Sequence, residues 1–182
     1  MKHLLDKGII HRDIAARNVL LDGNLKVKIS DFGLTKRTGS EFSSTVYYKQ
    51  MTRRAMPLYL YAPELLRQRL NQNEVCRFTH KSDVWAFGLL VWEVLTRGVK
   101  PFTRCPDLDF TKHIDTSLKR IEKGERPYIP TVIKENNISC FNKLWHIVYE
   151  QALEADPDKR EPITKVLGDL SDLLGPFEQV RG

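Results

Sequence analysis

Residues 83–95 form an almost continuously apolar run. A helix with apolar side chains on most of its sides has to be buried, so this run predicts a helix that is buried on most sides. The run is shorter than the roughly 20 apolar residues that cross a bilayer, and we expect no transmembrane segment elsewhere in the sequence. The run therefore favours a mainly helical domain with one core.

Further patterns predict more helices. Leu118 and Ile121, followed by the stop signal Gly-Glu-Arg-Pro at 124–127, describe one helix and its end. A one-sided apolar stripe over residues 141–149 describes the next helix. A last helix is expected over about 163–174, before Gly175 and Pro176.

Strand signals are short and few. Residues 9–10, 19–21 and 27–29 are β-rich runs, and Asp-Gly-Asn at 22–24 is typical of a tight hairpin turn between the last two. The polar stretch 68–77 predicts an interhelical loop. The predicted fold class is therefore mainly α with a few short β-strands.

Length and composition indicate how large a core the chain can form, in which compartment it works and which partners it can bind. A chain of 182 residues can bury close to 70% of its unfolded surface, enough for a single core. Cys76, Cys105 and Cys140 lack the spacing of a zinc site or a disulfide framework, which favours a reducing cytosol and a cytoplasmic protein. The net charge of +6 is compatible with a nucleic-acid partner, but the basic residues are dispersed and no aromatic stacking motif accompanies them, so we expect none.

Two motifs near the start of the chain carry the chemistry. Residues 11–18 are His-Arg-Asp-Ile-Ala-Ala-Arg-Asn, and residues 31–33 are Asp-Phe-Gly. Phosphoryl transfer needs a carboxylate where a substrate hydroxyl gives up its proton, and an amide and a second carboxylate that hold magnesium against the phosphates of ATP. Asp13, Asn18 and Asp31 fit these three roles, although any one of them taken singly would more often be structural.

Two further motifs follow in order, Tyr-Ala-Pro-Glu at 61–64 and Ser-Asp-Val-Trp-Ala-Phe-Gly at 82–88. A motif is confirmed by its context, and these four in this order resemble the protein kinase family. The resemblance implies that residues 1–182 are the C-terminal lobe of a protein kinase domain, with ATP and Mg²⁺ as cofactors.

The resemblance assigns a role to each motif residue. Asp13 is the catalytic base or orients the acceptor hydroxyl, and Asn18 and Asp31 bind Mg²⁺ and, through it, the nucleotide. Leu20 lies beneath the adenine ring, with ordinary core packing as the other interpretation. Asp83 would hydrogen-bond the backbone of the catalytic loop, and Glu64 and Arg160 would form a buried ion pair. His11 is expected to be structural in the catalytic loop, although it could equally be a core histidine. The other expected structural residues are Phe32 and Gly33.

The catalytic loop also narrows the substrate class. Ala15 and Arg17 are similar to the tyrosine kinase form of the loop, whereas serine and threonine kinases usually carry lysine at the position of Ala15. The resemblance implies a protein substrate with a tyrosine, and a catalytic Arg17 that reaches toward the phosphoryl group or the phenolic oxygen with a guanidinium that is always charged. Residues 31–36, 47–49 and 57–64 further resemble the Janus kinases, which are cytoplasmic non-receptor kinases that join receptor or signalling complexes through regions not present here.

Residues of about 31–64 correspond to the activation segment of the family. Tyr47 and Tyr48 lie where tyrosine kinases are phosphorylated, and Arg12 is the residue that pairs with the phosphate. The basic group Lys49, Arg53 and Arg54 could pair with the phosphate, engage acidic substrate residues, or be a solvated face. Alternatively, the two tyrosines are simply loop residues.

The resemblance begins inside the helix that precedes the catalytic loop. The sequence contains no glycine-rich loop, strand lysine with its glutamate partner, or adenine hinge. We therefore expect the smaller lobe to be missing, as in a fragment or a shortened product, and the chain alone to be inactive. Two functions remain open: a tyrosine kinase fragment that acts when an N-terminal lobe completes it, or a catalytically inactive, kinase-derived interaction or regulatory module.

Overall fold

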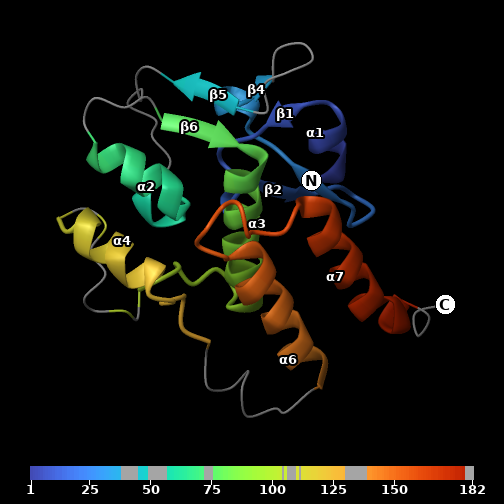
Figure 1. Cartoon of the computed structure of the whole chain (residues 1–182). Helices are drawn as coiled ribbons and strands as arrows, with labels where there is room; N and C mark the ends of the chain where they lie inside the picture. The colour runs from blue at the N-terminus through green and yellow to red at the C-terminus, as the bar shows by residue number, and fades with distance from the viewer. Residues whose placement is uncertain are drawn as a thin grey trace.

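The computed structural model describes residues 1–37, 45–48, 57–71, 76–103, 105, 110, 112–129 and 139–178. Helix α3 stands at the centre, with α2 and α4 on one side, α6 and α7 on the other, and short strands at one end (Figure 1). The fold class predicted from the sequence is confirmed. The helices are α1 (Lys2–Asp6), α2 (Pro63–Leu70), α3 (His80–Leu95), α4 (Ile114–Glu122), α6 (Ser139–His146) and α7 (Ile163–Glu178).

Helix α3 is the buried helix that the apolar run predicted, and it stands at the centre of the fold (Figure 1). Trp85 and Leu89 have no exposed surface. The helix begins before the apolar run because Thr79 and Ser82 cap it reciprocally. The Thr79 hydroxyl accepts the Ser82 N–H at 3.3 Å, and the Ser82 hydroxyl accepts the Thr79 N–H at 3.1 Å.

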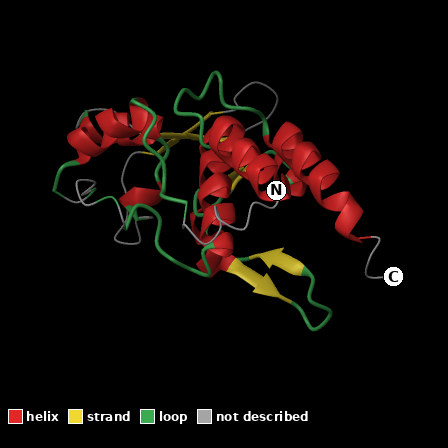
Figure 2. Ribbon diagram, turned by 90° about the horizontal axis from the view of Figure 1, so that it is seen from below, coloured by secondary structure: helices red, strands yellow, loops and turns green. Residues whose placement is uncertain are grey.

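The strands form antiparallel pairs and not one continuous sheet (Figure 2). The pairs are β1 (Ile9–Ile10) with β4 (Lys36–Arg37), β2 (Val19–Leu21) with β3 (Val27–Ile29), and β5 (Thr45–Tyr48) with β6 (Cys76–Thr79). The three predicted strands are thus present. In the predicted turn, the Asp22 carboxylate accepts the N–H groups of Asn24 and Lys26, each at 2.9 Å.

Two predicted boundaries were wrong. Residues 68–70 belong to α2, and Cys76 and Arg77 belong to β6, so the stretch 68–77 is not one loop. Its polar composition concealed the strand because only alternate residues, Cys76 and Phe78, are buried. Helix α7 continues past Pro176. A proline lacks one N–H donor, and the loss of that single bond did not end the helix here.

The predicted stripe over 141–149 is divided between α6 and a π-helical turn, η4 (Ile147–Ala152). The Leu153 N–H donates to the Val148 carbonyl at 2.8 Å, five residues back, which is the π-helical spacing. Ala152 and Leu153 then pack directly on Gly88 of α3. A Cβ atom at Gly88 would lie 2.9 Å from Leu153 Cδ2 and 3.0 Å from Ala152 Cβ.

Gly88 and Gly168 therefore form a matched pair for mutation. Both lie inside helices, but a Cβ atom at Gly168 would meet nothing within 4 Å. We expect Gly168→Ala to raise the free energy of unfolding by about 0.5–1 kcal/mol through helix propensity. Gly88→Ala should lower it by about 1–3 kcal/mol, because overpacking outweighs the same gain. Urea unfolding followed by circular dichroism measures both, and stabilisation by both variants would contradict the packing at Gly88.

Candidate active site

The catalytic loop, residues 11–18, is fastened to the core by one carboxylate from α3. Asp83 accepts the His11 N–H at 2.7 Å and the Arg12 N–H at 2.9 Å, one on each oxygen. These bonds hold Arg12 in a left-handed conformation, φ 70°, which is unfavourable for a residue with a side chain. Burial raises the pKa of Asp83 to about 6, and the two N–H donors and Arg12 oppose that increase.

Asp13 is oriented by two side chains of the same loop. The Asn18 amide nitrogen donates to the Asp13 carbonyl at 2.7 Å and to its carboxylate at 2.9 Å. Arg17 donates to the other carboxylate oxygen of Asp13. Because the Asn18 nitrogen is committed to Asp13, the Asn18 amide oxygen is the atom that this side chain offers to a ligand.

Asp31 follows the β2–β3 hairpin, whose two ends meet at Asn18 and Ser30. Asn18 directly precedes β2 and Ser30 directly follows β3, and the Ser30 N–H donates to the Asn18 carbonyl at 2.8 Å. Asp31 has φ 60°, and its carboxylate accepts the Gly33 N–H at 3.2 Å. A Cβ atom at Gly33 would lie 3.1 Å from that carboxylate oxygen, so glycine leaves room for Asp31.

His11 links the two loops. Its Nδ1 accepts the Asp13 N–H at 3.3 Å and its Nε2 lies 3.2 Å from the Ser30 carbonyl. A neutral ring protonated on Nε2 satisfies both bonds, and burial lowers the pKa of His11, which favours the neutral form. The ring also packs edge-to-face on Phe32, with 5.1 Å between centroids. His11 therefore stabilises the relative placement of Asp13 and Asp31.

The donor atoms at this site suit Mg²⁺ bound to a nucleotide. The Asn18 amide oxygen and the Asp31 carboxylate are hard oxygen ligands, and Mg²⁺ is usually held by one or two carboxylates together with substrate phosphates. Within the described ranges, no cluster of three or more His, Cys, Asp or Glu side chains could hold a metal ion. On β2, Leu20 is 55% exposed, which leaves an apolar surface beside the site.

The side chains of the other predicted residues, where the structure describes them, contact parts of the chain away from Asp13, Asn18 and Asp31. Arg160 and Glu64 form an ion pair that joins the segment before α7 to α2, with Nη1 2.8 Å from Oε1. Arg12 donates to the Leu34 carbonyl and lies over the Phe78 ring, 5.3 Å from its centroid. The backbone of Tyr47 and Tyr48 lies in β5, but their side chains, and all of Lys49, Arg53 and Arg54, are outside the described residues.

One residue that contacts the catalytic loop, Glu93, was not predicted from the sequence. Glu93 of α3 accepts the Ala16 N–H at 2.8 Å and is only 8% exposed. Burial raises the pKa of Glu93, whereas the Ala16 N–H and the charge of Arg17 lower it. An acidic residue in an otherwise apolar helical run was the signal that could have revealed it.

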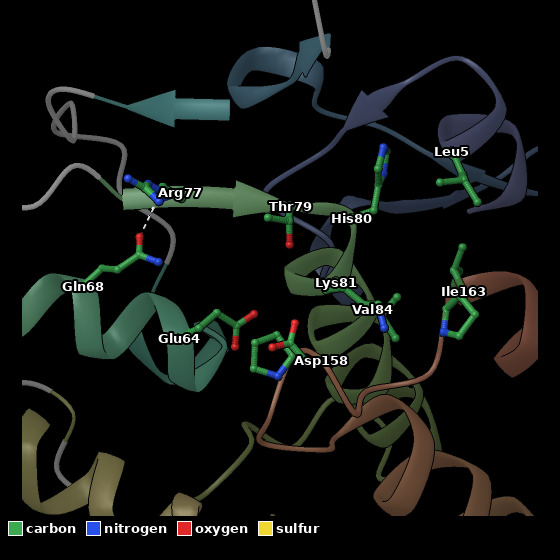
Figure 3. Close-up of a pocket in the computed structure, with 12 residues that line it drawn as sticks. Leu5, Glu64, Gln68, Arg77, Thr79, His80, Lys81, Val84, Asp158 and Ile163 are labelled. Atoms are coloured by element: carbon green, nitrogen blue, oxygen red, sulfur yellow. Dashed lines mark hydrogen bonds between the residues drawn. The ribbon is translucent and has the colours of Figure 1, made fainter. Parts of the chain in front are cut away.

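A cavity of about 650 Å³ lies between α2, the start of α3 and the start of α7 (Figure 3). Asp13, Asn18 and Asp31 do not line it, so it is separate from the candidate active site. Its walls include the apolar residues Leu5, Val84 and Ile163 and the polar residues Glu64, Arg77 and His80.

Comparison with known proteins gives the same family as the motifs. Residues 1–170 match the family described as protein tyrosine and serine/threonine kinase. Tyrosine-protein kinase csk-1 of Caenorhabditis elegans is 39% identical over 145 residues, which are 80% of this chain and 23% of that protein. Fibroblast growth factor receptor 1 of Xenopus laevis is 33% identical over 174 residues, 96% of this chain and 18% of that protein.

The chain thus spans about a fifth of the length of these relatives. In the part of the chain that the structure describes, every helix is too short or too polar to cross a membrane. With the motifs, the loop geometry and the match over residues 1–170 in agreement, the chain belongs to the protein tyrosine and serine/threonine kinase family.

Proposed function

We propose that this chain is the C-terminal lobe of a protein tyrosine kinase domain, which transfers the γ-phosphate of ATP to a tyrosine of a protein. The observation that best supports this proposal is that Asn18 and Arg17 hold the Asp13 carboxylate by hydrogen bonds. Asn18 directly precedes the β2–β3 hairpin, and Asp31 follows it. The tyrosine kinase name of the worm relative, together with Ala15 and Arg17, supports tyrosine as the acceptor.

In this proposal Asp13 orients the tyrosine hydroxyl and takes its proton. The phenolic oxygen forms a bond to the γ-phosphorus while the bond from that phosphorus to the β–γ bridging oxygen breaks, which releases ADP. The Asn18 amide oxygen and the Asp31 carboxylate would hold Mg²⁺, which supplies positive charge at the phosphates when bound. Arg17, 42% exposed, stabilises the negative charge of the transferred group, and exposed Leu20 would contact the adenine.

Asp13→Asn tests this proposal in the full-length protein. We expect tyrosine phosphorylation of a peptide substrate, measured with ATP and Mg²⁺, to fall by about 10²–10⁴-fold, because the amide keeps the shape but cannot take the proton. Asp172→Asn, at an exposed position, is the matched control and should leave the rate unchanged. Equal rates for Asp13→Asn and wild type would refute the assignment, and phosphorylation of serine peptides alone would refute the tyrosine specificity.

We further propose that residues 1–182 alone have negligible kinase activity, because two protein ligands bind Mg²⁺ weakly unless phosphates are held against it. A catalytically inactive, kinase-derived interaction or regulatory module is the alternative. The exposed apolar side chains of Leu21, Leu25 and Val27 on the β2–β3 hairpin, 62%, 78% and 67% exposed, favour a covering partner in either case. The resemblance to Janus kinases supports a cytoplasmic, non-receptor kinase in a receptor or signalling complex.

We also propose that phosphorylation of Tyr47 or Tyr48 regulates the kinase. The β5–β6 register pairs Tyr47 with Arg77, and Arg12 lies over Phe78 of the same strand. A phosphate adds nearly two negative charges, which arginine would bind.

Replacing both Tyr47 and Tyr48 with phenylalanine in the full-length protein should leave basal activity unchanged and remove activation by prior phosphorylation. The measurement compares peptide phosphorylation before and after preincubation with ATP. Retained activation in the double variant would exclude these tyrosines as the switch.

A further inference from the structure

Helix α3 holds the catalytic loop at two points, and only the first was expected. Asp83, in the first turn of α3, binds the N–H groups of His11 and Arg12. Glu93, near the end of the same helix, binds the N–H of Ala16. At a rise of about 1.5 Å per residue the backbones of Asp83 and Glu93 are some 15 Å apart along the helix axis. The loop residues that act on the substrate, Asp13 and Arg17, are therefore set by anchors at both ends of one rigid element.

The bond from Glu93 satisfies a donor that the loop itself cannot satisfy. Ala16 is the first residue of a 3₁₀ turn, Ala16–Asn18, and the residue before it, Ala15, has no side chain that could cap the turn. A capping side chain at the position of Ala15 would accept the N–H of Arg17 or Asn18 and would leave the Ala16 N–H without a partner. The Ala16 N–H instead donates to a carboxylate 77 residues away, that of Glu93.

The position of Glu93 is unfavourable for a charge. The side chain is buried, and it stands in the last turn of α3, where the helix dipole disfavours negative charge. Burial raises the pKa of Glu93. The same residue affects Tyr59, whose pKa is raised first by burial and then by the charge of Glu93, while the charge of Arg17 lowers it. The Glu93 carboxylate is held in this position by the Ala16 N–H.

We propose that Glu93 is a positioning residue for the phosphoryl transfer proposed above: its bond to the Ala16 N–H fixes the backbone from which the neighbouring Arg17 reaches the Asp13 carboxylate. The inference rests on the proposed function for its catalytic part only. The anchoring of Ala16 stands on the hydrogen bond and can be measured without catalysis.

The test compares Glu93→Gln with Glu93→Leu in the 182-residue chain. Glutamine keeps an oxygen for the Ala16 N–H without the charge, whereas leucine removes both the acceptor and the charge. Amide hydrogen exchange at Ala16 should become about 10- to 100-fold faster in Glu93→Leu, the effect of losing a hydrogen bond to a charged group. In Glu93→Gln the exchange rate at Ala16 should increase by less than it does in Glu93→Leu. Exchange in α3 should stay near wild type, and Glu150→Gln, at an exposed residue, is the matched control.

Unchanged exchange at Ala16 in Glu93→Leu would overturn the anchor. If Glu93→Leu does not fold, exchange at Ala16 is compared between wild type and Glu93→Gln, where loss of the charged acceptor should still make it faster; exchange as slow as in wild type would then overturn the anchor. In the full-length protein, Glu93→Gln should lower kcat for the peptide and leave the KM for ATP unchanged. If wild type phosphorylates no tyrosine, the proposed function fails but the exchange result still decides the anchor. If wild type is active and kcat is unaffected, the positioning role is wrong.

Discussion

Replacing Arg160 with methionine should lower the free energy of unfolding by about 3–5 kcal/mol, because it leaves the Glu64 carboxylate, only 12% exposed, without its counter-charge. Arg160 has no exposed surface. Its guanidinium donates to both carboxylate oxygens of Glu64, at 2.8 and 2.9 Å, and to the carbonyls of Lys81 and Glu154, at 2.8 and 2.7 Å. It also lies over the Trp85 ring, 5.3 Å from its centroid. These partners would all lose their contact at once.

Urea unfolding of the 182-residue chain, followed by circular dichroism, measures this loss. The double variant Arg160→Met with Glu64→Leu should recover part of it, because apolar side chains can replace a buried pair. Recovery should be incomplete, since the Glu154 carbonyl loses the Arg160 donor. Arg67→Met, at the half-exposed pair with Glu122, is the control and should change stability by less than about 1 kcal/mol. An equally small effect at Arg160 would contradict a structural role for the pair.

Local patterns predicted the elements that position the site. The apolar run of α3, the turn at 22–24 and the strands on either side of it follow from residues that are neighbours in sequence. The hairpin alone was enough to place Asn18 and Asp31 at one end of a paired ribbon. The pair of Glu64 and Arg160, 96 positions apart, has no local pattern and was expected only through the resemblance to kinases.

Features that depend on tertiary contacts were not predictable from the sequence. Arg12 adopts a left-handed conformation where Asp83 binds its N–H, and no propensity of arginine indicates this. Asp31 is also left-handed, with its own carboxylate bound to the Gly33 N–H. The π-helical turn at 147–152 follows a stripe that also fits an ordinary helix. Glu93 gave a signal, but its partner is a backbone N–H, which has no residue-type signature.

Replacing Asp83 with asparagine should remove a pH dependence of stability worth about 3 kcal/mol. The pKa of this carboxyl is raised from 3.8 to about 6 in the folded chain, a difference of about two pKa units at 1.36 kcal/mol each. The folded state therefore binds the proton more tightly than the unfolded state. The contribution of Asp83 to stability is largest below pH 3.8, falls as the pH rises between 3.8 and 6, and is constant above pH 6.

Urea unfolding at pH 4, 5, 6 and 7 gives this dependence as the difference between wild type and Asp83→Asn. The difference isolates Asp83, because His11, His80 and Glu93, whose pKa values are also altered by burial, titrate in both proteins. Parallel curves would show that Asp83 ionises as it does in the unfolded chain. Asparagine also loses one acceptor for the N–H groups of His11 and Arg12, so the variant should exchange these two amides faster at pH 7. The ionised carboxylate thus lowers the overall stability of the fold while it holds the catalytic loop in place.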